Sequence, residues 1–222
     1  MEIAPGIHLW PGKFDMAGQK KLIAEIFARV EEAPFYKPKM PVSGKSFSVE
    51  ETNFGTLGWF SDMKGYRYER VHPITHKPWP AIPDALIELW NERTQYKSPP
   101  ECCLVNLYRG AARMGLHQDR DEEAMDAPVL SVSLGDDALF RIGGETRRGP
   151  TKSLKLRSGD VLTFGGPARL AFHGIDRVIA GTSSLVPGGG RLNLTLRRVM
   201  AGTWPEHKKT PDQGADRAPH AL

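Results

Sequence analysis

Residues 191–197 show the clearest alternation of polar and apolar positions in the chain. The odd positions hold Arg191, Asn193, Thr195 and Arg197, and every even position is a leucine. Because successive side chains of a strand point to opposite faces, this pattern predicts a strand with a leucine face on the core. The other face points into the fold, where buried polar groups need polar partners. The alternation therefore predicts an internal site for a polar ligand.

The rest of the C-terminal half reads as short strands separated by Gly, Pro and Asp turns. With the strand just described, extended to residue 199, eight strands are expected, at residues 103–109, 114–119, 128–134, 138–142, 153–157, 160–164, 169–173 and 191–199. Eight short strands after a helical start predict an α+β, mainly β fold. The specific expectation is a jelly roll, or double-stranded β-helix, backed by N-terminal helices.

Two helices are expected before these strands. The first is capped by Asp15 and ended by Pro34, and its apolar positions recur at helical spacing: Leu22, Ile23, Ile26, Phe27 and Val30. The second begins near Pro83, and its inner side carries Leu86, Leu89 and Trp90. Residues 1–14, with their Pro and Gly breaks, predict an extended arm.

Residues 37–80 have a different character, with many Gly, Pro and Ser residues and no long period. A long irregular segment is either functional or disordered. This one is rich in aromatic side chains: Phe47, Phe54, Trp59, Phe60, Tyr66, Tyr68 and Trp79. That content argues against disorder and favours a functional role.

Length and composition favour a single domain, here placed at residues 1–202, with a jelly-roll core at 102–199. The chain has 222 residues, of which 40% are hydrophobic and 25% charged, an ordinary globular balance. Residues 203–222 are polar and Pro-rich and are expected to be a disordered tail. No apolar run is long enough for a membrane span and no secretory signal is evident, so a cytoplasmic protein is expected. Cys102 and Cys103 are adjacent and are interpreted as buried thiols.

The net charge of +4 and the isoelectric point of about 9.1 add a weak indication about the substrate. The last 18 residues hold three basic and three acidic side chains, so 3 − 3 = 0 and the basic excess lies in the folded body. A basic body is compatible with a phosphate-bearing substrate.

His117, Asp119 and His173 are the candidate metal ligands. His117 and Asp119 are two residues apart on an expected strand, so both side chains point the same way and can share one ion. His173 follows 54 residues after Asp119 (173 − 119 = 54), which leaves room for intervening strands. Two imidazoles and one carboxylate suit non-haem Fe(II) and leave one face of the ion open. A lone His, or one His-x-Asp pair, is common by chance, so the hypothesis depends on the conjunction with the arginine strand.

Arg191 and Arg197 lie roughly 20 Å apart along their strand. Leaning inward, the two guanidinium groups can clamp the ends of a short dicarboxylate, because the guanidinium fork binds carboxylates bidentately. Asn106 and Tyr108 follow the same alternation on the strand at 103–109 and offer an amide and a phenol to the same ligand. The alternative is that the arginines pair with internal Asp or Glu side chains.

At this point the sequence resembles the AlkB family of Fe(II)/2-oxoglutarate dioxygenases. The matching core segments are Asn106–Tyr108, Leu116–Glu122, Ala127–Gly135, Ser158–Val161, His173–Ile175 and Arg191–Arg197. Upstream, Thr52-Asn53, Leu57-Gly58-Trp59, Gly65-Tyr66 and Lys77-Pro78-Trp79-Pro80 are similar to the nucleotide-recognition lid of bacterial AlkB proteins. The resemblance covers roughly residues 20–200, and it identifies residues 37–80 as that lid.

The resemblance implies oxidative removal of methyl groups from ring nitrogens, as in 1-methyladenine and 3-methylcytosine. Iron, O2 and 2-oxoglutarate together hydroxylate the methyl group, and the unstable product releases formaldehyde, with succinate and CO2 as the other products. By resemblance, the iron ligands are His117, Asp119 and His173. Also by resemblance, Arg197 and Asn193 hold the 2-oxoglutarate end nearer the metal. By the same resemblance, the distal carboxylate of 2-oxoglutarate is held by Arg191, Asn106 and Tyr108.

A base must leave its stack to reach a buried metal, and flipped bases are gripped by aromatic rings. Trp59, with the His117 ring opposite, is expected to sandwich the base, and Tyr66 to contact the backbone or the base edge. Asp121 is expected to favour a cationic methylated base electrostatically. Arg147 is expected to close the pocket or touch phosphate. Each has a simpler alternative: a lid core residue for Trp59, and solvated surface charge for Asp121 and Arg147.

The leading hypothesis is therefore a DNA alkylation-repair dioxygenase, with RNA as a further candidate substrate. The expected partner is alkylated DNA, single-stranded rather than double-stranded, and the expected assembly is a monomer. An Fe(II)/2-oxoglutarate oxygenase acting on a protein or a small molecule is the alternative enzyme. A silent jelly-roll binding module would be expected to lack a metal ligand or an arginine, and neither is missing. A basic nucleic-acid binder without chemistry would not explain the inward polar strand.

Overall fold

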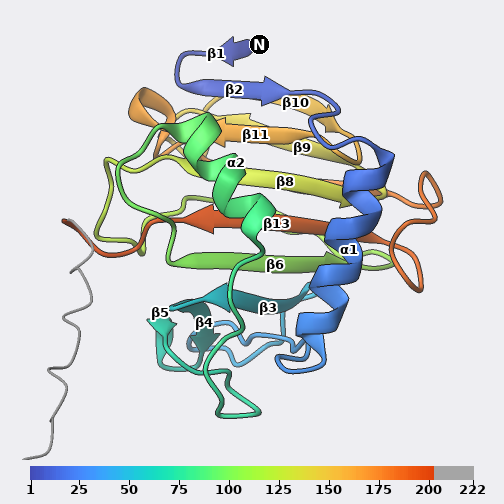
Figure 1. Ribbon diagram of the computed structural model, residues 1–222. Helices are drawn as coiled ribbons and strands as arrows, with labels where there is room; N and C mark the ends of the chain where they lie inside the picture. Colours follow the sequence, from blue (N-terminus) through green and yellow to red (C-terminus); the bar gives the residue numbers. More distant parts are fainter. Residues whose placement is uncertain (203–222) are drawn as a thin grey trace, which may run out of the picture.

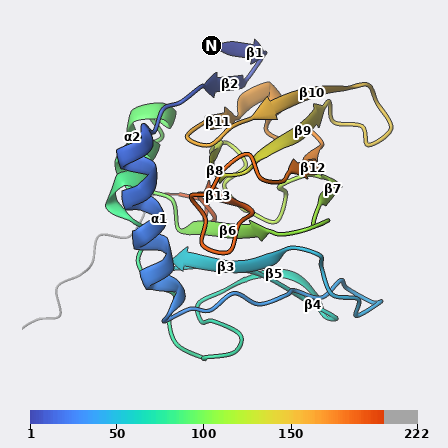
Figure 2. The ribbon, with the colours of Figure 1, turned by 90° about the vertical axis from the view of Figure 1, so that its right-hand side faces the viewer.

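The computed structural model describes residues 1–202 as two antiparallel β-sheets packed face to face, with two helices outside the larger one (Figures 1 and 2). The larger sheet consists, in spatial order, of β1 (Glu2–Ala4), β2 (Ile7–Trp10), β11 (Val161–Phe164), β8 (Val129–Gly135), β13 (Arg191–Arg197), β6 (Cys102–Tyr108) and β3 (Glu50–Gly55). The smaller sheet consists of β10 (Thr151–Leu156), β9 (Asp137–Gly143), β12 (His173–Ile179) and β7 (Met114–His117). This arrangement confirms the expected jelly roll. The expected disordered tail at 203–222 lies outside the described residues.

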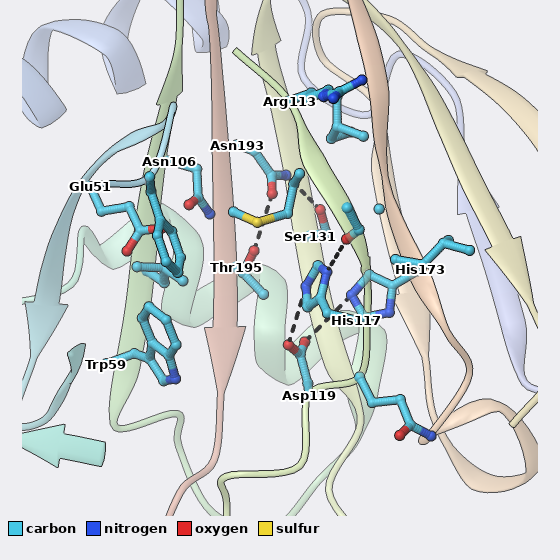
Figure 3. A pocket seen from close by; sticks show the side chains of 18 of the residues that line it. Glu51, Trp59, Asn106, Arg113, His117, Asp119, Ser131, His173, Asn193 and Thr195 are labelled. Atoms are coloured by element: carbon cyan, nitrogen blue, oxygen red, sulfur yellow. Dashed lines mark hydrogen bonds and ion pairs between the residues drawn. The ribbon is translucent and has the colours of Figure 1, made fainter. Parts of the chain in front are cut away.

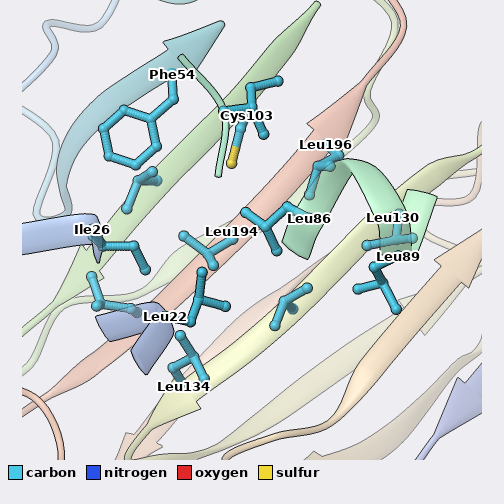
Figure 4. Close-up of a cluster of buried hydrophobic side chains, with 14 of the residues drawn as sticks. Leu22, Ile26, Phe54, Leu86, Leu89, Cys103, Leu130, Leu134, Leu194 and Leu196 are labelled. Atoms are coloured by element: carbon cyan, nitrogen blue, oxygen red, sulfur yellow. The ribbon is translucent and has the colours of Figure 1, made fainter. Parts of the chain in front are cut away.

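Helices α1 (Met16–Val30) and α2 (Asp84–Thr94) cover the outer face of the larger sheet. The Asp15 side chain caps α1 by accepting a hydrogen bond from the Gly18 amide at 2.8 Å. The apolar stripes of both helices meet the leucine face of β13, as Figure 4 shows for Leu194 and Leu196. The leucines of β13 thus fix which side of the strand is core. Within residues 1–202, no helix is long and apolar enough to cross a membrane.

The opposite face of the larger sheet looks toward the smaller sheet, and the space between them is only partly apolar. Phe140, Phe164 and Ile175 come from both sheets and fill one end of this space. Ser131 and Ser133 of β8 point into the remainder, together with the polar positions of β13. The two sheets therefore enclose an apolar cluster beside a polar cavity.

The expected strand at 169–173 is wrong. The chain instead forms a 3₁₀ turn, η1 (Gly166–Ala168), and β12 begins only at His173. The amides of Arg169 and Ala171 bond back to the carbonyls of Gly166 and Ala168, so these residues continue the turn and do not join a sheet ladder. His173 therefore begins a strand rather than ending one.

Two further expectations need correction. β7 ends at His117, so Asp119 lies in the loop that follows and not on the strand. The arm at 1–14 contains two paired strands, and β2 joins the larger sheet beside β11. The reason is visible in β2, where Ile7 and Leu9 alternate with less buried residues and cover the core.

The segment at 37–80 is ordered and lies along the β3 edge of the larger sheet (Figure 2). It supplies β3 and the hairpin β4 (Gly58–Asp62) and β5 (Gly65–Glu69). The Trp79 ring packs so closely against Gly58 that an added Cβ would overlap the ring. The Trp79 indole also donates to the Glu69 carbonyl at 2.9 Å. These contacts explain why glycine precedes Trp59 in the chain.

Candidate metal and co-substrate site

A cavity of about 720 Å³ opens between the two sheets, with residues from the 37–80 segment at its rim. It is lined by all four odd-numbered residues of β13, by Asn106 and Tyr108 of β6, and by the three candidate metal ligands. Figure 3 shows Asn106, Asn193 and Thr195 gathered with His117, Asp119 and His173 from different parts of the chain. Residues far apart in the sequence therefore meet at one site, as the alternation of β13 predicted.

The side chains of His117, Asp119 and His173 form a compact triad. One donor atom from each lies within 4.8 Å of the other two. Each histidine Nε2 lies 3.8 Å from an Asp119 carboxylate oxygen: His117 from Oδ1 and His173 from Oδ2. β12 pairs with β7 so that His173 stands directly opposite His117, which brings the two rings together. Asp119 reaches the same point from the loop after β7.

Backbone carbonyls fix the orientation of both imidazoles. His117 Nδ1 is 2.9 Å from the Gly115 carbonyl, and His173 Nδ1 is 2.9 Å from the Ala171 carbonyl. Because a carbonyl only accepts, each Nδ1 carries the proton and each Nε2 keeps a free lone pair. Both histidines therefore present the same nitrogen to a shared ion.

The two oxygens of the Asp119 carboxylate have different surroundings: one binds a cation and the other lies at the triad. Arg197 Nη2 donates to Oδ1 at 2.8 Å, whereas Oδ2 is buried without a partner among residues 1–202. Burial alone would raise the pKa of Asp119, but Arg197 and the two imidazoles hold it well below its usual range. An ionised oxygen that is buried and unpartnered beside two free imidazole nitrogens fits a divalent metal. The donor set is the one that suits Fe(II).

The two arginines of β13 differ in what they already bind. Arg191 is fully buried and gives one hydrogen bond, from Nη2 to Ser133 Oγ at 2.8 Å. Its Nε and Nη1 have no partner within the described part of the chain. Burial lowers the pKa of Arg191 to about 10, with nearby Tyr108 opposing the shift. Arg191 is therefore a buried cation that an anion entering the cavity would satisfy.

Arg197, in contrast, partly follows the alternative considered above, because it pairs with internal carboxylates. Besides Asp119, its Nε lies 3.5 Å from Glu122 Oε1. The Asn193 amide donates to Ser131 Oγ at 2.7 Å, and the buried Asn106 oxygen has no partner among residues 1–202. The polar face of β13 thus has one end held by acids near the triad and one end open to an anion.

Comparison with known proteins agrees with this donor set. A sequence model of the 2OG-Fe(II) oxygenase superfamily matches residues 6–197. The chain is 56% identical over 199 residues to the alpha-ketoglutarate-dependent dioxygenase AlkB homolog of Caulobacter vibrioides, covering 90% of each chain. It is 39% identical over 191 residues to AlkB of Escherichia coli, covering 84% of this chain and 88% of the relative. This chain belongs to the AlkB family.

The fold also supports membership of this family. The solved structure of OsALKBH1 superposes with a TM-score of 0.76 at 29% sequence identity, covering 89% of this chain and 99% of that one. As an AlkB-family protein, this chain is an Fe(II)- and 2-oxoglutarate-dependent dioxygenase that uses O2. The resemblance inferred from its motifs is confirmed.

Residues of the 37–80 segment are held toward the cavity of this AlkB-family protein. Asn53 fixes the Trp59 backbone in both directions, accepting from its amide and donating to its carbonyl, each at 3.0 Å. The Trp59 ring stacks on Tyr66 at 5.5 Å between centroids. Its indole nitrogen donates to Asp121 Oδ2 at 2.9 Å. Trp59 is therefore held at the cavity by specific hydrogen bonds, and its ring also packs against the apolar cluster of Cys102, Leu104 and Val199.

Asp121 and Arg147 both line the cavity and are both exposed. β7 ends at His117, four residues before Asp121, so strand alternation does not place this side chain. Instead, the hydrogen bond from the Trp59 indole holds the Asp121 carboxylate at the cavity. The Arg147 guanidinium lies 6.0 Å from the centre of the Phe172 ring, at the rim. The structure brings both side chains to the mouth, where the sequence had left surface charge as an alternative.

A buried network behind the triad escaped the sequence reasoning. Arg169 donates to the backbone carbonyls of Asp119 and Ala127 and to the Glu122 carboxylate. Tyr68 of the lid donates to the same carboxylate. No sequence signal marks Arg169, because it follows a 3₁₀ turn and has no periodic neighbours. Glu122 stands in an acidic run that resembles a solvated face.

The stability of the metal-free protein is expected to fall between pH 6.5 and about pH 4 because of His173. Burial, and then the nearby His117 imidazole, lower the pKa of His173 from 6.5 to about 4. The unfolded chain therefore binds this proton more readily than the folded protein. The contribution is complete above pH 6.5 and is lost as the pH falls, by up to about 3 kcal/mol.

Denaturant unfolding at a series of pH values, in the presence of a chelator, measures this effect. His173→Gln cannot titrate and is expected to show a weaker pH dependence in the same interval. Equal pH dependence of the variant and the wild type would contradict the assignment.

Proposed function

We propose that this protein repairs N-alkylated bases in DNA, removing the methyl group of 1-methyladenine and 3-methylcytosine by oxidation. RNA is proposed as a second substrate polymer. The observation that supports this most directly is the cavity itself. It holds the metal triad and the buried Arg191 guanidinium, which has two nitrogens without a hydrogen-bond partner in the described structure, and Trp59 and Tyr66 stack at its rim. Such a cavity can take an anionic co-substrate and a flat ring together. Membership of the AlkB family points to the same reaction.

In the proposed site, His117, Asp119 and His173 would hold iron, each imidazole offering its Nε2 and Asp119 its carboxylate. Iron bound there, with O2 and 2-oxoglutarate, would supply the oxidising chemistry that the methyl carbon needs. Overall, N–CH3, O2 and 2-oxoglutarate give N–H, formaldehyde, succinate and CO2. Both oxygen atoms are accounted for, one in the hydroxymethyl group and one in succinate.

The polar residues of β13 and β6 orient the co-substrate. Arg191, with Asn106 and Tyr108, binds the distal carboxylate, because its two unpaired nitrogens are buried and face the cavity. Arg197 and Asn193 bind the end nearer the triad. This division follows from position, because Arg197 already contacts Asp119 and Arg191 lies at the other end of the strand.

The lid residues bind the base. Trp59 stacks on one face of the base and His117 lies opposite, while Tyr66 extends the stack toward the nucleic-acid backbone. Asp121 keeps a carboxylate beside the Trp59 indole, where it favours a base that carries a positive charge. Arg147, exposed at the mouth, contacts phosphate.

Formaldehyde release from short oligonucleotides carrying 1-methyladenine or 3-methylcytosine tests the proposal, with succinate measured in the same samples. Trp59→Ala is expected to lose about 10- to 100-fold in kcat/KM for formaldehyde release, the range for one stacked base. Turnover of 2-oxoglutarate without oligonucleotide should remain. Trp59→Phe, which stacks but cannot bond Asp121, should lose much less.

Succinate formation with no formaldehyde from any methylated oligonucleotide would overturn the repair proposal. It would leave an oxygenase with a protein or small-molecule substrate.

The proposal includes single-stranded DNA as the better polymer, because extruding a base from a single strand costs less than breaking a pair. Residues 1–202 act as one catalytic domain with residues 37–80 as its lid, and the protein works as a monomer in the cytoplasm. One chain supplies every residue of the proposed site. Cys102 and Cys103 are free and buried, which suits a reducing compartment.

A further inference from the structure

Glu51 has no place in the site described so far, although it lines the same cavity. It lies on β3, the strand that the 37–80 segment adds to the edge of the larger sheet, and is fully buried. Its backbone is fixed by two hydrogen bonds with Tyr36, at 2.8 and 2.9 Å. Neither carboxyl oxygen has a hydrogen-bond partner in residues 1–202. A buried carboxyl group without a partner is costly, so its position calls for a partner that enters the cavity.

The sheet register and Figure 3 together show where Glu51 lies in the cavity. Glu51 pairs with Asn106, and Asn106 pairs with Asn193, so these three residues form a row across β3, β6 and β13. Glu51 is the end of the row, about 10 Å from the arginine strand at the usual strand spacing. Figure 3 shows its carboxyl group on the Trp59 side of the cavity, across from His117 and Asp119. The carboxyl group of Glu51 therefore lies on the Trp59 side of the cavity, where the base is proposed to bind, with the co-substrate residues on the neighbouring strands.

The state of the carboxyl group decides what it can recognise. Burial raises the pKa of Glu51 to about 8, with Arg197 opposing the shift. At neutral pH the group is therefore mainly protonated, and it offers one O–H donor and one carbonyl acceptor side by side. A glutamine side chain offers the same pair, and it binds the N6 amine and N7 of adenine bidentately.

We propose that Glu51 is a specificity-determining residue that binds the base edge on which an exocyclic amine stands beside a ring-nitrogen acceptor. It thereby favours N1-methylated adenine over N3-methylated cytosine. In 1-methyladenine the methyl group faces the metal while N6 and N7 remain free on the adjoining edge. In 3-methylcytosine the corresponding edge has N4 beside a C–H group, so the donor of Glu51 finds no acceptor. This assignment rests on the proposed repair function.

The test compares kcat/KM for formaldehyde release from two oligonucleotides that differ only in the lesion, 1-methyladenine or 3-methylcytosine. Glu51→Leu is expected to lower the 1-methyladenine to 3-methylcytosine ratio on the order of tenfold, the value of one bidentate contact. Glu51→Gln keeps a donor and an acceptor and should hold the ratio within about twofold of the wild type. The KM for 2-oxoglutarate should be unchanged in both variants.

The leucine variant is expected to fold, because it replaces an unpartnered buried carboxyl group with an apolar side chain of similar size. Its thermal unfolding temperature should be no lower than that of the wild type, and 2-oxoglutarate turnover without oligonucleotide should persist.

Equal losses on both lesions in Glu51→Leu, or a raised KM for 2-oxoglutarate, would overturn the role of Glu51 while leaving the repair function intact. A ratio that falls as far in Glu51→Gln as in Glu51→Leu would overturn it as well. Absence of formaldehyde from both oligonucleotides with wild-type protein would overturn the repair function, and this assignment with it.

Discussion

Asp119→Ala is expected to lower turnover by more than about a thousandfold and to abolish metal binding. Asp119 contributes the only carboxylate of the triad, and its buried Oδ2 has no hydrogen-bond partner in the described structure and lies beside the His173 imidazole. Without it, two neutral nitrogens remain, and the nearby Arg197 cation repels the ion. Titration with Mn(II) under anaerobic conditions measures binding directly, and formaldehyde and succinate measure turnover.

Asp121→Ala is the matched control, because it removes a carboxylate two residues away in the same loop. It should bind metal like the wild type and lose activity only on the base. Asp119→Asn guards against a folding defect, since it keeps an acceptor for Arg197 but has no charge for the metal. Mn(II) binding of Asp119→Ala at wild-type strength would refute the metal site.

Arg191→Met is expected to raise the KM for 2-oxoglutarate by about 10- to 100-fold, the effect of losing a charge-assisted contact with a carboxylate. The guanidinium is buried, and two of its nitrogens have no hydrogen-bond partner in the described structure. Saturating 2-oxoglutarate should restore much of kcat, because the contact is remote from the triad. Initial rates over a range of 2-oxoglutarate concentrations separate the two constants.

Arg191→Lys keeps the charge but not the planar fork, and it should fall between the wild type and the methionine variant. Thermal unfolding of Arg191→Met should show little loss of stability, since the buried cation has one hydrogen bond to give up. An unchanged KM in Arg191→Met would place the distal carboxylate elsewhere.

The sequence predicted best where a strict period met a buried surface. The leucines of β13 left one choice of face, so the alternation alone was enough to place the polar positions of this strand in a cavity. The expectation failed at residues 169–173, where apolar residues suggested a strand but the chain continues the turn that begins at Gly166 and Pro167. The residue pattern alone did not show whether the apolar residues or the turn residues before them would decide the local structure.

Side chains whose roles depend on burial were beyond sequence reasoning. Glu51 and Glu122 are both nearly or fully buried, yet each stands in a polar stretch that resembles a surface. Arg169 contacts Asp119 across 50 residues of chain, a distance over which no local pattern carries information. The metal triad could be proposed because three residue types of known chemistry coincide, but the residues that hold them in place have no such signature.

The loop after β7 joins the lid to the iron site within four residues. Asp119 faces the triad, Asp121 bonds Trp59, and Glu122 bonds Tyr68, so the metal site and both lid contacts share one short piece of backbone. The lid is consequently not an interchangeable module. A 37–80 segment taken from a relative with other substrates would lack its matching partners at 121 and 122. Changing Glu122 would also disturb Arg169 and Arg197, which hold the neighbouring ligand Asp119. Substrate range and oxidative chemistry in this protein are therefore expected to evolve together.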